Sequence, residues 1–470
     1  MGDGIGAEAV GCDLGDQRLA QRYALLLDRL AGQPGRSIPA AGRGRAEVQA
    51  AYRFFDHPRV TPDRLLAPHV AATRRRLAAE PVVVVARDTT EIDLTRPGRV
   101  VGGPLGDGRR SGFFSHVLLA ATPRGVPLGL LADRTWARDP AAAGRPPARH
   151  KRRPLAEKES ARWVEGYRHC CAAARALPGV EVVCVSDSEG DVSELFAEAA
   201  AQRHAAKFVV RACQPRCLAG GGRRSAQDCV AAAPVLGTRR VAVAKRDAPP
   251  SETRRRRTAR RGRAAVLTTR VAAVTPRPPR RPGGELPAVA VTVVLAREVS
   301  PPEGEEPVEW LLLTDVPAAT PADAERVLEL YQQRWLIETY FRVLKGGCGV
   351  EKLQLEAPGR LLNALALYKV VAWRVLLVTM AGRDCPDLPC DAVLDEAEWK
   401  AVYVAVLRTR LPETPPPLGE MVRLIARLGG HLGRTSDPPP GALAMWIGLQ
   451  QARTLALGWE TFGPGATTYA

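Results

Sequence analysis

Apolar and polar positions along the chain predict helices toward both ends and β-strands between them. Leucines and Tyr23 recur at helical spacing over residues 16–31, which predicts an amphipathic helix. Continuous apolar runs at 81–87, 180–186 and 206–212 are short and rich in valine. Runs of this kind predict strands buried on both faces. The pattern therefore predicts an α/β protein.

Further runs extend this prediction. Strands at 113–122 and 127–137 would complete an antiparallel meander with the first strand. Residues 213–306 carry strand-like runs around a turn-rich stretch and predict a β-rich insertion. Residues 361–380 are apolar on all sides, but the neighbouring Arg360 and the internal lysine and arginine favour a buried helix over a membrane span.

The most informative pattern is a helix predicted from residue 322 to Lys345. Pro321 suits its first turn, and the following glycine pair provides a stop. On a helical wheel, Tyr331, Arg334, Glu338 and Lys345 fall within an arc of roughly 60° beside an apolar stripe. An ordinary solvated face is the alternative, but polar groups at the edge of a packed face suit a binding site.

Two aspartates follow predicted strands. Asp88 comes at the end of the run 81–87, and Asp187 comes directly after the run 180–186. We expect both at strand ends, where their carboxylates can face one cleft, although an aspartate in this position is often only a turn residue. Asp191 is expected to cap or orient rather than to bind a ligand directly.

The net charge indicates a class of binding partner, and the cysteine content bears on zinc binding and disulfides. The net charge of +17 and the seven arginines between Arg254 and Arg263 favour a polyanionic partner, most simply nucleic acid. A membrane surface is the competing partner, but we find no amphipathic anchor for it. The ten cysteines form no zinc-binding pattern. Without an export signal, we expect free thiols and a soluble, cytoplasmic protein.

The spacing Tyr-x2-Arg-x3-Glu-x6-Lys that begins at Tyr331 resembles the signature of bacterial insertion-sequence DDE transposases of the hairpin-forming, cut-and-paste family. Other segments resemble the same family in the same order, including LGDQRLAQR, AEVQAAYRFFDHPRV, CVSDSEGDVSELF and PVEWLLLTDVP. The resemblance implies an α/β fold with an RNase H-like mixed-sheet catalytic core and a β-rich insertion, flanked by helical N- and C-terminal domains.

The resemblance also implies roles for single residues. Asp88, Asp187 and Glu338 would form the catalytic triad that binds two Mg²⁺ ions, for which Mn²⁺ can substitute. Trp310 would stack on a base turned out of the duplex, unless it only packs in the core. Tyr331, Arg334 and Lys345 would hold the phosphates that flank the scissile bond. Arg211 would be a further DNA contact, unless it only forms a salt bridge. Near the transposon-end DNA, the resemblance implies Arg18, Arg43, Arg45 and Arg53.

The implied domains are a helical end-binding domain (1–76), the catalytic core (77–212 and 307–375), the basic insertion (213–306) and a helical dimerisation region (376–470). The implied activity is nicking at the element ends, hairpin formation and opening, and strand transfer. Its partners would be double-stranded DNA, as terminal inverted repeats and target, and a second copy in a synaptic homodimer, with no membrane. The resemblance also implies a cytoplasmic protein associated with the bacterial nucleoid. A catalytically silent DNA-binding regulator and another RNase H-like nuclease remain alternatives.

Overall fold

The computed structural model describes residues 5–33, 35, 37–42, 44–106, 108–140, 157–220, 224–243, 245, 260–281, 284–434 and 437–464. The chain divides into two compact units. The first unit comprises Met1–Arg145 with Trp335–Ala470, and the second comprises Pro146–Arg334. The domain limits expected from the sequence stay a prediction.

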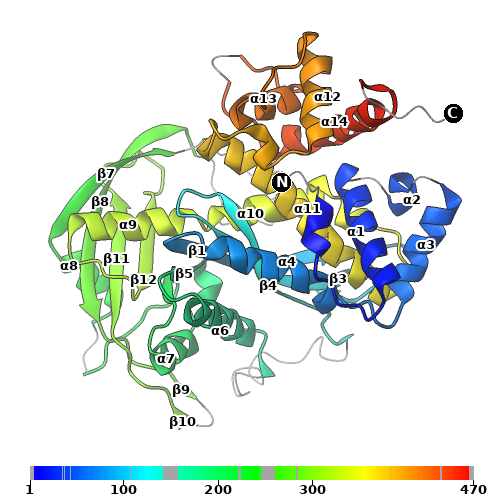
Figure 1. The fold of residues 1–470 in the computed structure, drawn as a ribbon. Coiled ribbons are helices and arrows are strands. Elements are labelled where there is room, and N and C mark those ends of the chain that lie inside the picture. Colours follow the sequence, from blue (N-terminus) through cyan, green and yellow to red (C-terminus); the bar gives the residue numbers. More distant parts are fainter. Residues whose placement is uncertain are drawn as a thin grey trace. The chain divides into compact units, whose positions relative to one another are not determined.

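The first unit begins with short helices, drawn in blue in Figure 1. Asp16 caps α1 by accepting a hydrogen bond from the Arg18 N–H, and Thr61 caps α4 in the same way through the Arg64 N–H. The amphipathic helix expected at 16–31 is confirmed. These helices are η1 (Ile5–Ala9), α1 (Gln17–Gly32), α2 (Ile38–Ala41), α3 (Arg45–Asp56) and α4 (Pro62–Leu77).

An antiparallel sheet follows in the same unit, and it confirms the expected meander. Strand β3 pairs with β1 on one side and with β4 and β2 on the other. Helices α4 and α11 both pack against β4. The strands are β1 (Val82–Asp93), β2 (Gly103–Leu105), β3 (Arg110–Ala121) and β4 (Pro127–Trp136).

The remaining elements of the first unit are helical. Among the described residues, α11 (Pro358–Asp384) is the one helix long and apolar enough to cross a membrane by length and composition alone, and 83% of its most apolar window is buried inside the protein. The other elements are α10 (Trp335–Arg342), η6 (Val343–Gly347), η7 (Val350–Lys352), η8 (Cys390–Ala392), α12 (Glu396–Leu407), α13 (Leu418–Leu428) and α14 (Ala442–Phe462).

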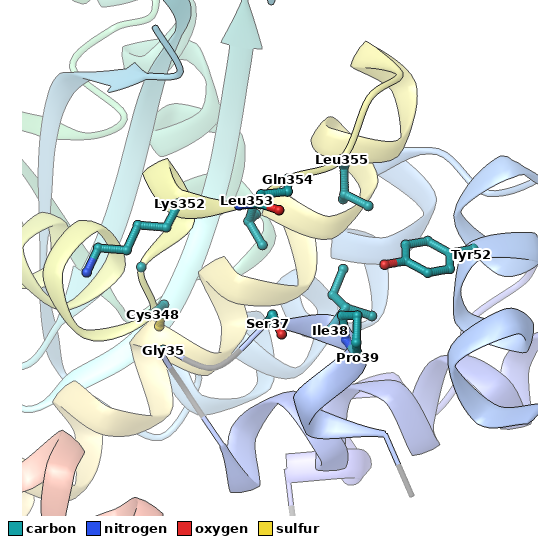
Figure 2. Close-up of a pocket in the computed structure, with 11 residues that line it drawn as sticks. Gly35, Ser37, Ile38, Pro39, Tyr52, Cys348, Lys352, Leu353, Gln354 and Leu355 are labelled. Carbon is teal, nitrogen blue, oxygen red and sulfur yellow. The ribbon is translucent and has the colours of Figure 1, made fainter. Parts of the chain in front are cut away.

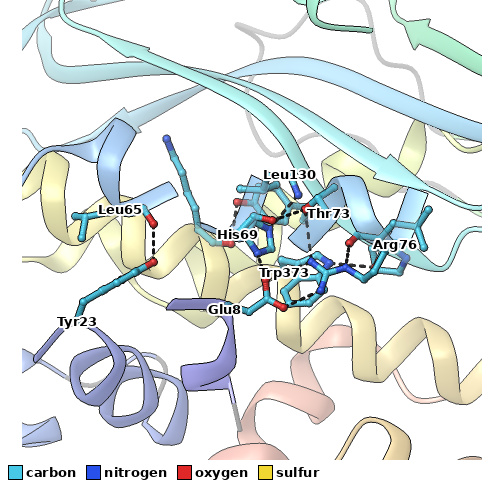
Figure 3. Close-up of polar contacts among 12 residues, drawn as sticks. Glu8, Tyr23, Leu65, His69, Thr73, Arg76, Leu130 and Trp373 are labelled. Carbon is cyan, nitrogen blue, oxygen red and sulfur yellow. Dashed lines mark hydrogen bonds and ion pairs between the residues drawn. The ribbon is translucent and has the colours of Figure 1, made fainter. Parts of the chain in front are cut away.

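A buried polar network ties the N-terminal segment of this unit to its sheet (Figure 3). Glu8 accepts a hydrogen bond from His69 Nδ1 at 2.5 Å and pairs with Arg76 at 2.7 Å. The Leu130 N–H donates to His69 Nε2 at 3.0 Å, so the ring proton lies on Nδ1 and the imidazole is neutral. The Glu8 charge is therefore balanced by Arg76.

The second unit contains a parallel strand pair. Strands β5 (Glu181–Ser186) and β6 (Lys207–Arg211) are parallel, with α7 (Ser193–Ala201) in the connection between them. Their valine-rich runs are buried, as the sequence predicts. Helices α6 (Ala161–Ala176) and α9 (Pro321–Gln332) pack against β5.

The sheet of the second unit continues in antiparallel fashion from β6 through β12, β11, β8 and β7, the green strands of Figure 1. The expected insertion is β-rich, and its long strands extend this sheet. The remaining elements are η4 (Ser188–Gly190), α8 (Ala226–Ala232), β7 (Val235–Val243), β8 (Arg263–Val274), β9 (Arg280–Arg281), β10 (Gly284–Glu285), β11 (Val291–Glu298) and β12 (Glu309–Thr314). A mixed sheet with helical flanks confirms the predicted α/β class.

Candidate active site and nucleic-acid interface

Asp187 lies where the sequence predicts it. Strand β5 ends at Ser186, and Asp187 follows as the N-cap of the short turn η4, where its side chain accepts a hydrogen bond from the Glu189 N–H at 2.9 Å. A carboxylate at the carboxyl end of a parallel strand stands at the edge where α/β sheets bind ligands.

In the second unit, four predicted residues surround or act on Tyr331, namely Trp310, Arg334, Arg211 and Asp187. The Trp310 ring meets the Tyr331 ring edge-on, with centroids 5.9 Å apart, and the Arg334 guanidinium lies 5.9 Å from the Tyr331 ring. Burial raises the pKa of the Tyr331 phenol, the positive charges of Arg334 and Arg211 lower it, and the negative charge of Asp187 raises it. This cluster places two cations and one carboxylate near one phenol.

Arg211 is the exposed member of this cluster. It ends strand β6, and its guanidinium donates to the Glu309 carbonyl oxygen at 3.4 Å. Trp310 is half-buried, whereas Tyr331 and Arg334 are buried. Arg211 is therefore the member of this cluster most accessible to solvent.

Asp88 belongs to the first unit, and one detail of its prediction is wrong. Strand β1 does not end at Asp88 but continues to Asp93, because residues 89–93 go on pairing with β3. Asp88 therefore lies within a strand, opposite Val117, and its side chain accepts a hydrogen bond from the Thr89 N–H at 2.7 Å. Glu338 lies in the first turn of α10, and α10 packs against β1.

The continuous helix predicted as far as Lys345 is also wrong. Helix α9 ends at Gln332, α10 begins at Trp335, and a π-helical turn, η6, carries Lys345. Tyr331 and Arg334 consequently belong to the second unit, whereas Glu338 and Lys345 belong to the first. The four signature residues therefore do not lie on one continuous helix.

Lys345 is engaged by a neighbouring carboxylate. Its ammonium lies 3.2 Å from Glu351 Oε1, and the same oxygen accepts a hydrogen bond from the Asp93 N–H at 3.0 Å. Glu351 thus joins η7 to the end of β1 and competes with any phosphate for Lys345. The sequence interpretation missed Glu351, although its acidic side chain six residues after the signature lysine was a usable signal.

The predicted end-binding arginines lie on the N-terminal helices. Arg18 is exposed in the first turn of α1, and Arg45 and Arg53 are exposed at the two ends of α3. Arg43 lies outside the described residues. A pair between Arg29 and Glu47, 3.1 Å apart, holds α1 to α3, so the exposed arginines sit on mutually braced helices.

A cavity of about 400 Å³ opens beside these helices within the first unit (Figure 2). Gly35 adopts a φ of 86°, and a Cβ there would lie 2.6 Å from the Gly347 carbonyl oxygen, so only glycine allows this approach. The Tyr52 hydroxyl points toward the enclosed space. The lining residues are Gly35, Ser37, Ile38, Pro39, Tyr52, Cys348, Gly349, Lys352, Leu353, Gln354 and Leu355.

The donor chemistry of the predicted triad suits hard cations. Carboxylate oxygens are the ligands that Mg²⁺ prefers, and Asp88, Asp187 and Glu338 supply only such oxygens. Within the part of the chain that the structure describes, no three His, Cys, Asp or Glu side chains form a group that could hold a metal ion.

Three family models match separate parts of the chain. The transposase DNA-binding model matches residues 5–60, the transposase DDE domain model residues 234–373, and the transposase Tn5 dimerisation domain model residues 370–461. The matched domains, together with the mixed α/β fold, define a DDE transposase. The chain belongs to the insertion-sequence DDE transposases and carries a DNA-binding, a DDE and a dimerisation domain in that order.

The DDE model match includes Glu338 and begins after Asp88 and Asp187, so the roles of these residues stay a prediction. A solved structure, the cryo-EM structure of a piggyBac transposase synaptic complex with hairpin DNA, is similar over 73% of this chain and 56% of its own, with 8% sequence identity and a TM-score of 0.31. The chain thus spans just over half the length of that protein, and a likeness this distant supports no conclusion about function.

Proposed function

We propose that the protein is the transposase of a bacterial insertion sequence and moves the element by a cut-and-paste reaction. The observation that carries the proposal is the order of the three matched domains, which would supply end binding, phosphodiester chemistry and dimerisation in one chain. Its substrates would be double-stranded terminal inverted repeats and target DNA, bound by a homodimer in the cytoplasm.

Asp88, Asp187 and Glu338 would hold two Mg²⁺ ions, with Mn²⁺ as a substitute. When bound, such ions supply Lewis acidity that favours the attacking oxygen and the leaving oxygen. Arg211 and Arg334 would orient the phosphates that flank the scissile bond, and the observation that both cations and Asp187 act on the same Tyr331 phenol supports this role. Trp310 would stack on an extruded base, a contact worth roughly 1–3 kcal/mol.

The proposed reaction proceeds by nicking, hairpin formation, hairpin opening and strand transfer. Water attacks the phosphodiester at the element end, the P–O3′ bond breaks, and a 3′-hydroxyl is released. That hydroxyl then attacks the opposite strand, forming a hairpin and displacing the flanking DNA. A second water opens the hairpin, and the regenerated 3′-hydroxyl attacks a target phosphodiester.

Cleavage of labelled element-end duplexes tests the proposal. With Mg²⁺ or Mn²⁺, the wild type should produce nicks and then hairpins, whereas EDTA should stop both. The Asp88→Ala, Asp187→Ala and Glu338→Ala variants should bind the duplex and fail to cut it. Glu329→Ala is the matched control, because Glu329 is an exposed carboxylate on α9 outside the predicted triad.

Other outcomes separate the alternatives. Tight binding without cleavage in any metal would identify a silent DNA-binding regulator. Nicks that never become hairpins or strand-transfer products would identify a different nuclease of the RNase H-like class.

A further inference from the structure

A buried ion pair lies directly beyond Asp187 in the second unit. The Asp191 side chain is 0% exposed and that of Arg216 is 8% exposed. Asp191 Oδ1 accepts hydrogen bonds from Arg216 Nε, at 2.9 Å, and from Nη2. Arg216 also donates to the Asp191 carbonyl oxygen at 3.1 Å and to Ser193 Oγ at 2.8 Å. The pair is therefore fixed from several sides.

The second carboxylate oxygen of Asp191 holds a different segment. Asp191 Oδ2 accepts hydrogen bonds from the Cys213 N–H at 2.8 Å and from the Gln214 N–H at 3.0 Å. These two residues follow strand β6, which ends at Arg211. One buried carboxylate therefore ties the exit of β6 to the turn that follows β5.

That turn is the one that carries Asp187. Asp187 is the N-cap of η4 and Asp191 is its C-cap, and the Asp191 N–H donates to the Ser188 carbonyl oxygen at 3.3 Å. Because η4 spans only three residues, a shift of Asp191 moves the backbone of Asp187. At the other end, Cys213 follows Arg211 by two residues. Asp191 consequently fixes the spacing between Asp187 and Arg211.

We propose that Asp191, held by Arg216, is a positioning residue that sets the placement of the Asp187 carboxylate relative to Arg211. The inference rests on the proposed function, because it assigns Asp187 to the metal-binding triad. Asp191 acts through backbone amides and the η4 turn, whereas Asp187 itself would bind the metal. Partners of this kind typically change metal affinity or activity by about 10- to 100-fold when they are removed.

A second ion pair in the same unit, between the half-buried Arg263 and the buried Glu298, provides the matched control. Arg263 Nε lies 2.8 Å from Glu298 Oε1 and joins β8 to β11. Strand β11 is separated from β5 by β12 and β6. Loss of this pair should lower the melting temperature without moving Asp187.

The experiment is end cleavage with titrated Mg²⁺ and Mn²⁺, together with calorimetric Mn²⁺ binding and a melting curve for each full-length variant. We expect Asp191→Asn to cut about 10- to 100-fold more slowly at saturating Mg²⁺ and to need more Mn²⁺ for half-saturation, with end-DNA affinity retained. Arg216→Lys, which keeps the charge, should lie between Asp191→Asn and the wild type. Glu298→Gln should have a lower melting temperature than the wild type, and its cleavage should keep the wild-type dependence on metal concentration.

If Asp191→Asn and Arg216→Lys keep the wild-type rate and metal dependence while the wild type cuts normally, this inference alone is overturned. It is also overturned if Glu298→Gln shifts the metal dependence as much as Asp191→Asn does. No cleavage by the wild type in any metal would overturn the proposed function and this inference with it.

Discussion

At the scale of single residues, the environment of a charge decides what its removal does. Burial alone would raise the pKa of Glu8, but the hydrogen bonds from His69 and Arg76 lower it to about 2. Burial lowers the pKa of His69, and this effect outweighs the hydrogen bond to Glu8, which alone would raise that pKa. Both groups therefore release protons on folding, and both link stability to pH in the same direction.

The first prediction concerns this pH dependence. In the unfolded chain His69 titrates near 6.5 and Glu8 near 4.5, so stability should fall as pH drops below 6.5 and fall further below 4.5. The pKa shift of Glu8 corresponds to about 3 kcal/mol of folding stability. This stabilisation is fully present above pH 4.5 and is lost as the pH falls toward 2. His69→Gln should flatten the loss between pH 7 and pH 5 in urea unfolding. His431→Gln is the control, and parallel curves for the two variants would contradict the assignment.

A second residue-scale prediction concerns Lys345. Because Glu351 holds the Lys345 ammonium at 3.2 Å, removing that charge should free the lysine for phosphate. Glu351→Gln keeps an oxygen to accept the Asp93 N–H. We expect up to about fivefold tighter binding of end DNA at low salt, in keeping with the 0.2–1 kcal/mol of a partly exposed pair.

Fluorescence anisotropy with labelled end duplexes measures this change. Glu356→Gln removes a nearby carboxylate that pairs with Arg99 at 3.3 Å, and it should leave the Lys345 contribution unaltered. Equal gains in both variants would mean that only the total charge matters.

At the scale of elements, the break between α9 and α10 is a feature that the local sequence does not predict. No glycine or proline marks it; the Gln333 and Arg334 N–H groups bond three residues back, to the carbonyl oxygens of Leu330 and Tyr331. Further on, a Cβ at Gly347 would lie 2.8 Å from the Trp446 ring. The π turn at Lys345 thus depends on packing against α14, which no local pattern contains.

The third prediction concerns the contact between α11 and α3. The buried Asn363 amide on α11 donates to the carbonyl oxygens of Phe55 and Val60, both at 3.0 Å. Asn363→Ala leaves both carbonyls without this donor, and we expect a loss of about 1–3 kcal/mol together with weaker end binding. Calorimetry and anisotropy measure the two effects.

Arg360→Ala is the matched control on the same helix face. Arg360 pairs with the exposed Asp56, and its removal should cost much less stability than that of Asn363 because solvent screens an exposed pair. If Arg360→Ala were less stable than Asn363→Ala, the ion pair of Arg360 with Asp56, and not the Asn363 amide, would be the main contact that holds α3 against α11.

At the scale of the whole molecule, the net charge of +17 makes DNA affinity dependent on salt. If six to ten phosphates are neutralised, raising salt from 50 to 200 mM should weaken binding by about 10³- to 10⁵-fold. Arg53→Gln, at an exposed position on α3, should reduce the salt slope by about one. A flat salt dependence of end binding would argue against phosphate contacts as the main source of affinity.

The sequence predicted the fold class well because buried valine runs and capped helices are local signals. It placed Asp187 correctly for the same reason, since β5 ends one residue before it. It misplaced the end of β1 because pairing with β3 carries the strand past Asp88. It assigned no role to Glu8, whose partners lie on α4, and contacts of such sequence separation are not visible as a pattern.

The division of the first unit into two chain segments has a consequence for synthesis on the ribosome. Helix α4 and strand β4 are complete by Trp136, whereas α11, which packs on both, begins only at Pro358. At typical translation rates of about 5–20 residues per second, α4 and β4 are synthesised about 10–40 s before α11. During that interval the apolar faces of α4 and β4 are open to chaperones, and the second unit can complete its own sheet before the first unit closes.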